Sequence, residues 1–300
     1  MSWRIDMSMT VREFEEIRNY IYRVSGIFVH DDFIQQTETR LAPLLDSSGT
    51  NTFKGLISRL VYKNDIKLCD HVIQAVTSEE NYFFSDLQPF ETFNDVILPK
   101  LAETIVSRKR KSHVRRGAKI NIWSASASKG HEPYGIAMLI NEFVDGAGEM
   151  GVERNDFNIL ASDLSATALA KAVSGEYSEE EVHHGIDEAR RNKFFISSGG
   201  KWMTKSTIQD IVDFRKVNLA EPFTRLGGFD VIFCRNALEH FNEATQRSVL
   251  TQFTYMLTRT GFLVLDHNNS LNGFHDYYEQ VEHNGSMVFR RLENMEFSNI

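Results

Sequence analysis

Residues 119–138 read KINIWSASASKGHEPYGIAM, and this stretch decides the fold of the chain. It joins an apolar run at 119–125 to a turn of small side chains, and a helix is expected from there over about 132–144. A buried strand that leads through a small-residue turn into a helix is typical of a parallel α/β sheet.

The same alternation of strand and helix continues along the rest of the chain. Its further segments are the apolar runs 157–163, 229–236 and 261–267 and the helices expected near 165–173 and 243–258. Residues 275–291 fit an antiparallel hairpin that closes the sheet. The predicted fold class is therefore α/β, with a doubly wound, Rossmann-like domain over 118–300.

The first third of the chain has helical periodicity instead. Thr10 and Glu13 have the spacing of a capping box and Gly26 stands where a helix would end, so a helix is predicted at 11–25. Further helices are expected from about 31, near 52–62 and near 66–77, with Pro43 and 47–49 as breaks. Residues 1–106 are thus predicted to form an all-α domain.

A basic run joins the two parts. Seven of the nine residues 108–116 are Lys, Arg or His. A solvated linker over 107–117, or a helix end, is the usual explanation of such a run, and docking of an acidic partner is the alternative.

Composition narrows the classes of function. Lys and Arg number 33 against 41 Asp and Glu, which gives a formal net charge of −8 and argues against a general nucleic-acid binder. Cys69 and Cys234 lack metal-ligand spacing and suit a reduced compartment. Because no run of 18 apolar residues and no signal-peptide core occurs, we expect a cytoplasmic protein without membrane insertion.

Polar residues follow the predicted strands, and ligands of open α/β sheets bind at the carboxyl ends of strands. Asp163 stands where nucleotide-binding folds place a carboxylate for ribose hydroxyls, or it caps the next helix. Asn218 could read an adenine edge or form a turn. Arg235 and Asn236 follow the run VIFC. The P-loop and GxGxxG motifs are missing, which disfavours kinases, ATPases and ordinary NAD enzymes.

These segments resemble a known family, the CheR-type chemotaxis receptor methyltransferases. The resemblance is carried by WSASASKGHEPYGIAM (123–138), LASDLSATALAKAVSGEY (160–177), VNLAEPF (217–223), FDVIFCRNALEHFNEATQ (229–246), GFLVLDH (261–267), IRNYIYRVSGIFVHDD (17–32) and AVTSEENYFFSD (75–86). It implies transfer of a methyl group from S-adenosyl-L-methionine to glutamate side chains of a cytoplasmic chemoreceptor domain or related signalling protein, with S-adenosyl-L-homocysteine as product. It also implies a small antiparallel β subdomain at about 177–215.

The resemblance assigns roles to individual residues. Glu132 would meet the amino group of the methionine moiety, Asp163 would hold the ribose hydroxyls, and Asn218 with Leu219 would flank the adenine. Arg235 and Asn236 would border the methionyl end. The cofactor-binding set that it implies is Glu79, Asn81, Ala125, Glu132, Asp163, Asn218, Leu219, Arg235 and Asn236, with Ser85 and His240 at the catalytic positions and no metal.

The chain departs from the family pattern close to the chemistry. The family motif Thr-x-Asn-x-Thr-x-Phe-Phe-Arg corresponds here to residues 77–85, so Ser85 replaces an arginine, and Glu79 and Asn81 replace Asn and Thr. His240 replaces a tyrosine. Two alternatives therefore stay open: a catalytically impaired regulatory or scaffold protein that binds the cofactor or its product, and a methyltransferase with a different acceptor.

The segments that recognise the receptor in the family also differ in this chain. The family's second helix is rich in arginines, whereas residues 35–43 contain only Arg40. The loop 197–200 looks shorter than in members that bind a receptor's tether peptide, so a tether-independent mode is expected.

Overall fold

The N-terminal part of the chain is a bundle of four helices. The structure is a computed structural model that describes residues 8–77, 82–111, 119–147, 150–266, 271 and 273–293. The bundle consists of α1 (Val11–Ser25), α2 (Ile34–Ser47), α3 (Phe53–Lys63) and α4 (Ile66–Thr77), with a 3-10 turn, η1 (Asp31–Phe33), before α2. The capping box of Thr10 and Glu13 and the left-handed Gly26 bound α1 as predicted.

Pro43 is a correction to the predicted helix ends. It lies inside α2, which continues to Ser47. Leu41 and Leu45, on either side of Pro43, are fully buried in the bundle, and this packing carries the helix through the residue that lacks an N–H.

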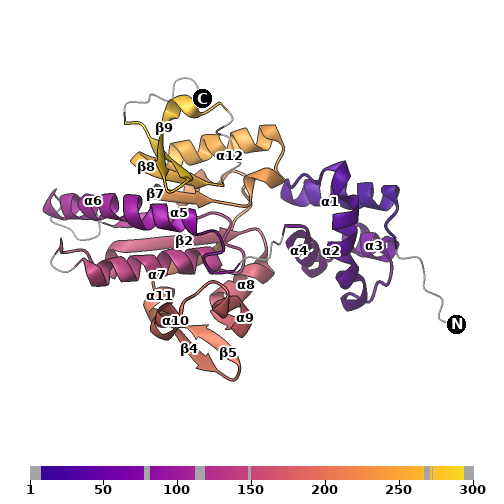
Figure 1. The fold of residues 1–300 in the computed structure, drawn as a ribbon. Coiled ribbons are helices and arrows are strands. Elements are labelled where there is room, and N and C mark those ends of the chain that lie inside the picture. Colours follow the sequence, from indigo (N-terminus) through magenta and orange to yellow (C-terminus); the bar gives the residue numbers. More distant parts are fainter. Residues whose placement is uncertain are drawn as a thin grey trace.

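A seven-stranded sheet forms the centre of the rest of the chain (Figure 1). In sheet order its strands are β6 (Val212–Lys216), β2 (Phe157–Asp163), β1 (Ile120–Ser124), β7 (Phe229–Cys234), β8 (Leu257–Leu265), β10 (Ser286–Arg291) and β9 (Tyr278–His283). The first five are parallel, and β10 and β9 form the predicted antiparallel hairpin at the edge. Strand order reverses between β1 and β7, which is where such folds bind ligands.

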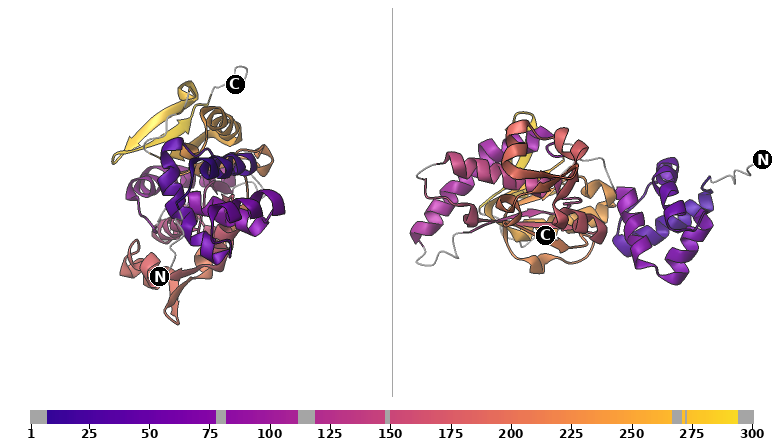
Figure 2. Two further views of the ribbon diagram at one scale, coloured as in Figure 1. Left: turned by 90° about the vertical axis from the view of Figure 1, so that its right-hand side faces the viewer. Right: turned by 90° about the horizontal axis from the view of Figure 1, so that it is seen from below.

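Helices cover both faces of the sheet, as a doubly wound fold requires (Figures 1 and 2). The helices around the large sheet include α5 (Leu87–Thr92), the π-helical turn η2 (Phe93–Ile97), α6 (Leu98–Lys111), α7 (His131–Gly146), α8 (Ala166–Ser174) and α12 (Glu243–Met256). Ile122 of β1 packs in the cluster under α6 and α7, and its neighbour Trp123 packs against Phe253 of α12. Adjacent residues of one strand thus point to opposite faces of the sheet and pack against different helices.

Two segment assignments differ from the sequence-based expectation. Residues 107–111, expected to begin a linker, form the last turn of α6, and 112–118 lie outside the described residues. The small sheet, of β3 (Glu176–Ser178), β5 (Lys201–Thr204) and β4 (Phe195–Ser198), is confirmed. Residues 212–216 do not belong to it, because they pair with β2 as the edge of the large sheet.

The division into domains at residue 106 remains a prediction, and the packing informs it. α6 contributes Leu101 and Ile105 to the core beneath the sheet rather than to the four-helix bundle. The small sheet is accompanied by α9 (Glu179–His183) and α10 (Glu188–Phe194), with α11 (Ser206–Gln209) leading to β6.

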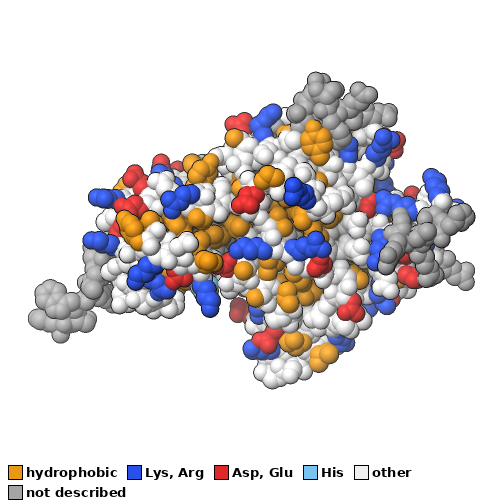
Figure 3. All heavy atoms as spheres, turned by 180° about the vertical axis from the view of Figure 1, so that it is seen from behind, with side chains coloured by type: hydrophobic (Ala, Val, Ile, Leu, Met, Phe, Trp, Pro, Cys, Tyr) orange, Lys and Arg blue, Asp and Glu red, His pale blue; other side chains and the backbone are white. Residues whose placement is uncertain are grey.

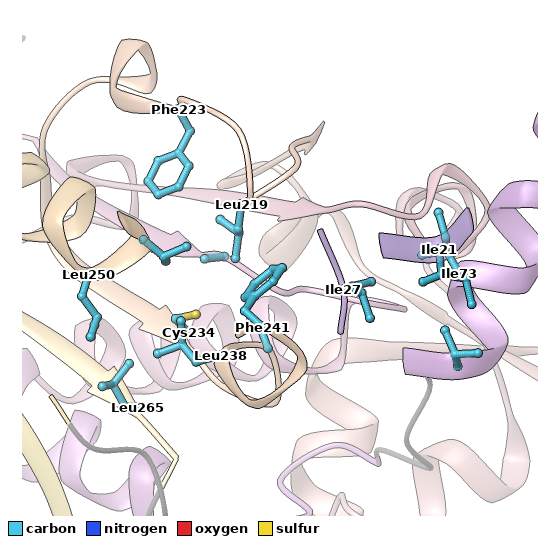
Figure 4. Packing of buried hydrophobic residues seen from close by; sticks show 14 of the residues in the cluster. Ile21, Ile27, Ile73, Leu219, Phe223, Cys234, Leu238, Phe241, Leu250 and Leu265 are labelled. Atoms are coloured by element: carbon cyan, nitrogen blue, oxygen red, sulfur yellow. The ribbon is translucent and has the colours of Figure 1, made fainter. Parts of the chain in front are cut away.

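The four-helix bundle sits against the carboxyl ends of the parallel strands (Figure 2). Ile27 and Ile73 belong to one apolar cluster with Leu219 and Phe241 of the sheet domain, and Figure 4 shows Ile27 between Ile73 and Phe241. The N–H of Phe28 donates to the carbonyl of His240 at 2.7 Å. Within the described ranges, no helix has the length and apolar character needed to span a membrane.

Candidate functional site

An open pocket of about 1110 Å³ lies at the carboxyl ends of the strands, with the helical bundle as its outer wall. It brings together every predicted site residue that the structure describes: Ser85, Ala125, Glu132, Asp163, Asn218, Leu219, Arg235, Asn236 and His240. Glu79 and Asn81 lie outside the described residues. The residues predicted from the strand ends therefore line one pocket, and their roles in binding and catalysis stay a prediction.

Arg235 lies among three carboxylates. It follows β7 directly, its Nη2 is 2.6 Å from Asp86, its Nε is 3.6 Å from Asp266 and its Nη1 is 3.8 Å from Glu132. The side chain is only 12% exposed, and within the described part of the chain its buried Nε has no hydrogen-bond acceptor. When ionised, these four groups carry an excess of negative charge, so the pocket suits a ligand with positive charge.

Glu132 lies in the first turn of α7. Ser124 donates its hydroxyl to Oε1 at 2.8 Å. Burial raises the pKa of the Glu132 carboxyl, while Arg235 and the hydrogen bond from Ser124 act in the opposite direction. A buried carboxylate at this end of the sheet provides a partner for an ammonium group.

Gly130 permits the tight entry into α7. Its φ is +92°, and a Cβ there would lie 2.9 Å from both the Ala172 Cβ and the Tyr177 hydroxyl. Only glycine fits this left-handed position without strain, and it allows the small-residue turn before α7 to lie close to the pocket.

Asp163 ends β2 and faces the pocket. Its Oδ2 accepts the N–H of Ser128 and its Oδ1 accepts the N–H of Ser165, both at 2.9 Å. Burial raises the pKa of Asp163. The alternative role as the cap of the next helix belongs instead to Ser165, whose hydroxyl accepts the Ala168 N–H. Each carboxylate oxygen retains acceptor capacity for a diol.

Asn218 has a local role within the pocket wall. Its Oδ1 accepts the N–H of Ala220 at 3.0 Å and its Nδ2 donates to Glu221 at 3.3 Å, so the turn interpretation holds. Leu219 beside it is buried. This turn therefore forms part of the wall of the pocket.

Ser85 and His240 come from distant segments of the chain. Ser85 is exposed next to Asp86, after two aromatic residues that serve as packing: Phe83 contacts His131 and Tyr177 edge-on. His240 ends the 3-10 turn η7 (Leu238–His240) and borders the pocket. Both predicted catalytic positions thus reach one site.

Several pocket residues received no role from the sequence. Ile73, Gln74 and Thr77 of α4 line the pocket, as does His131. Asp86 stood in the quoted motif directly after Ser85, and that adjacency was the available signal for it. Among the described residues no cluster of His, Cys, Asp and Glu could hold a metal ion.

Comparisons with known proteins agree with this geometry. Residues 79–287 match the family model described as CheR methyltransferase, SAM binding domain. The chain is 29% identical over 285 residues to the chemotaxis protein methyltransferase Cher2 of Pseudomonas putida, covering 95% of this chain and 99% of that protein. It is 30% identical to chemotaxis protein methyltransferase 1 of Pseudomonas aeruginosa, with 95% and 99% covered, and 30% identical to that of Vibrio cholerae, with 95% and 98% covered.

Proposed function

The chain belongs to the CheR methyltransferase family, and from that premise we propose that it methylates glutamate side chains in the cytoplasmic domain of a chemoreceptor or a related signalling protein. It is an S-adenosylmethionine-dependent methyltransferase. The names of its relatives support the class of acceptor. The observation that carries the proposal is the acidic pocket around Arg235 at the strand ends.

The residues present fit S-adenosylmethionine. The cofactor carries a sulfonium and an ammonium, which match the excess of carboxylates, and one carboxylate, which the guanidinium of Arg235 suits. The Arg235 Nε makes no hydrogen bond within the described residues and lies 3.6 Å from Asp266, so it could donate to such an acceptor. Asp163 would hold the ribose hydroxyls, Glu132 the ammonium, and the turn at Asn218 and Leu219 the adenine.

When bound, the cofactor supplies an electrophilic methyl group on a positively charged sulfur. The task of the chain is then to hold the cofactor and an acceptor carboxylate in line, since an ionised carboxylate needs no base. Ile73 and Thr77 on α4 form part of the outer wall of the pocket. Positioning, rather than proton transfer, is therefore the contribution expected of these residues.

Ser85 sets how the acceptor carboxylate is held. Arg235 is the one Lys or Arg among the described residues that line the pocket, and carboxylates already surround it. A serine hydroxyl donates one hydrogen bond, whereas an arginine donates two in parallel and brings a charge. Carboxyl methylation by this chain is expected to be slower than with an arginine at position 85.

The experiment that tests the proposal has two steps. Calorimetric titration with S-adenosylmethionine and S-adenosylhomocysteine measures cofactor binding. Transfer of a tritiated methyl group to purified cytoplasmic chemoreceptor domains of the same organism then measures activity, with base-labile label as the mark of a methyl ester. Cofactor binding without a labelled receptor would instead support the regulatory alternative.

We also propose a cytoplasmic location, because the acceptor domain lies there, and recognition without a tether peptide. The turn between β4 and β5 consists of Gly199 and Gly200, both with positive φ, which makes a tight two-residue hairpin. Such a hairpin offers little loop for a peptide to contact.

A further inference from the structure

The segment 82–86 brings two groups to the rim of the cofactor pocket, and it does so in a strained conformation. Ser85 lines the pocket, and Asp86 next to it holds Arg235 at 2.6 Å. Phe84, just before them, has a φ of +54°, in the left-handed region that a bulky side chain rarely adopts. A residue in such a conformation persists only where its surroundings hold it. The contacts of Phe84 and its neighbours therefore identify what holds the segment at the pocket.

One support is the small subdomain, residues 176–204, which contains the three-stranded sheet with α9 and α10 and lies below α7 in Figure 1. Figure 3 shows hydrophobic side chains on the surface where this subdomain, at the bottom of the view, joins the sheet domain. Phe83 is fully buried, with its ring edge-on to Tyr177 of β3 at 4.8 Å and to Phe195 of β4 at 5.5 Å. A Cβ at Gly185 would lie 1.6 Å from the Phe83 carbonyl oxygen, so the two backbones touch and only glycine fits.

Two polar side chains of the small subdomain complete this support. The ring of His184, which follows α9, stacks on Tyr82 with the centroids 5.0 Å apart. The guanidinium of Arg190, in α10, lies over the Phe84 ring, 4.7 Å from its centroid. Arg190 also donates two hydrogen bonds of 2.9 Å to the carboxylate of Glu142 on α7. Because paired hydrogen bonds fix the plane of the guanidinium, Arg190 fastens Phe84 to the helix that begins at the pocket.

The sequence neighbours of these two side chains contact a different ring. His183, next to His184, lies edge-on to Trp202 of β5, with the centroids 6.0 Å apart. Arg191, next to Arg190, lies over the same Trp202 ring, 5.6 Å from its centroid. Each pair therefore has one member on the strained segment and one member away from it, which gives two matched comparisons within one subdomain.

We propose that His184, Gly185 and Arg190 are positioning residues, through which the small subdomain holds Ser85 and Asp86 at the cofactor pocket. The inference rests on the proposed function and adds to it a role for the small subdomain in the methyl-transfer step. The carboxylates assigned to the cofactor lie on β2 and α7, outside the segment 82–86. Loss of these contacts is therefore expected to lower kcat more than it lowers cofactor affinity.

Two pairs of variants test the inference: Arg190→Met against Arg191→Met, and His184→Ala against His183→Ala. Tritium transfer to a purified cytoplasmic chemoreceptor domain gives kcat, and calorimetry gives the affinity for S-adenosylmethionine. Because a small misplacement near the reacting atoms is costly, kcat is expected to fall about tenfold in Arg190→Met and about threefold in His184→Ala, with cofactor affinity and both control variants unchanged.

A conservative variant separates positioning from general damage to the fold. Arg190→Lys keeps a charge near Phe84 but loses the paired hydrogen bonds to Glu142, so its kcat is expected between those of Arg190→Met and the parent protein. Equal kcat values for Arg190→Met and Arg191→Met would overturn the inference. Because His184 is exposed, the histidine pair decides in the same way where Arg190→Met does not fold.

Amide hydrogen exchange of the peptide 82–92, which spans the segment and α5, gives a readout that does not depend on turnover. Faster exchange in Arg190→Met than in Arg191→Met supports the positioning role even when the parent protein transfers no methyl group, and that combination contradicts only the proposed function. Where the parent protein transfers no methyl group, equal exchange in the two variants overturns the inference.

Discussion

The carboxylate of Asp70 on α4 accepts the N–H of Ala166 at 2.8 Å, so a side chain of the helical bundle caps a helix of the sheet domain. The same carboxylate accepts the N–H of Thr167 at 2.9 Å and the hydroxyl of Ser165 at 3.0 Å. These are the open donors at the start of α8, where a negative charge is favourable. Because Asp163 is two residues before Ser165, this contact joins the position of the bundle to the cofactor pocket.

Asp70→Ala is expected to lower the free energy of unfolding by about 1–2 kcal/mol at pH 7, the usual loss of a helix cap. Burial alone would raise the pKa of Asp70, but hydrogen bonds from Thr167, Ala166 and Ser165 lower it below its ordinary value of 3.8. The stabilisation is therefore present above pH 3.8 and is lost as the pH falls further. Urea titrations against Asp32→Ala, an exposed aspartate, measure it. Equal stabilities of the two variants at pH 7 would contradict the capping role.

Gly26→Ala is expected to disturb the seam between the bundle and the sheet domain. A Cβ at Gly26 would lie 2.3 Å from the Ala220 Cβ, and the residue has a φ of +76°. Gly49→Ala is the matched control, because Gly49 has a φ of +69° and nothing within 4 Å of an added Cβ. Both variants carry the left-handed strain of about 1 kcal/mol, and Gly26→Ala adds about 1–3 kcal/mol of overpacking. Thermal unfolding that ranks the two variants equally would show that Ala220 moves aside freely.

The strand ends were predictable because two local signals combine in a parallel sheet. Apolar runs locate the strands, and the carboxyl ends of parallel strands meet at one edge, so Asp163 and Arg235 converge although 72 positions separate them. The extent of α2 past Pro43 was not predictable, since it depends on the burial of Leu41 and Leu45 by other helices.

Polar contacts between residues far apart in the chain were also not predictable from the sequence. Asp86 pairs with Arg235 from 149 positions away, and Asp70 caps α8 from 96 positions away. A carboxylate alone specifies neither partner, because any helix start or guanidinium would satisfy it. Residues 212–216 pair with β2 rather than with the small sheet for a similar reason: Val212 and Phe214 alternate as in any half-buried strand.

Cofactor affinity is expected to fall as the solution becomes acidic. Burial raises the pKa of Asp163 above 3.8 and that of Glu132 above 4.5. Without ligand, the charged forms are the costly ones, so stability from these groups is greatest at low pH and declines as pH rises through the raised pKa values. Ribose hydroxyls and an ammonium stabilise the charged forms instead, so binding weakens as pH falls through the same window.

Asp163→Asn isolates one part of this dependence. Loss of a charge-assisted hydrogen bond, about 1.5–3 kcal/mol, should weaken S-adenosylmethionine binding at pH 7 about ten- to hundredfold. Calorimetry from the lowest pH at which the protein stays folded up to pH 8 should also show a flatter pH profile than the parent protein gives. A parent affinity that stays constant over the whole range would contradict the assignment of charged roles to Asp163 and Glu132.

Ser85→Arg is expected to raise kcat/KM for glutamate methylation. A guanidinium at the rim would hold an incoming carboxylate by two charge-assisted hydrogen bonds, and about 1.5–3 kcal/mol corresponds to roughly a ten- to hundredfold gain. Ser85→Gln is the control, because it adds length and hydrogen bonding without charge. Transfer of tritiated methyl groups to a receptor domain measures the rates.

Asp86 could reduce the gain in kcat/KM expected from Ser85→Arg, and a double variant tests this. Its carboxylate, 49% exposed, adjoins position 85 and holds Arg235 at 2.6 Å, so a new arginine has a competing internal partner. Adding Asp86→Asn to Ser85→Arg removes that competitor while retaining a hydrogen-bonding side chain. If Ser85→Arg alone leaves kcat/KM unchanged and the double variant raises it, an ion pair between the new arginine and Asp86 explains why the single variant has no effect. If both variants bind the cofactor and neither exceeds Ser85→Gln, the result favours either a different acceptor group, sought among neutral nucleophiles, or the regulatory alternative in which the chain binds the cofactor without turnover.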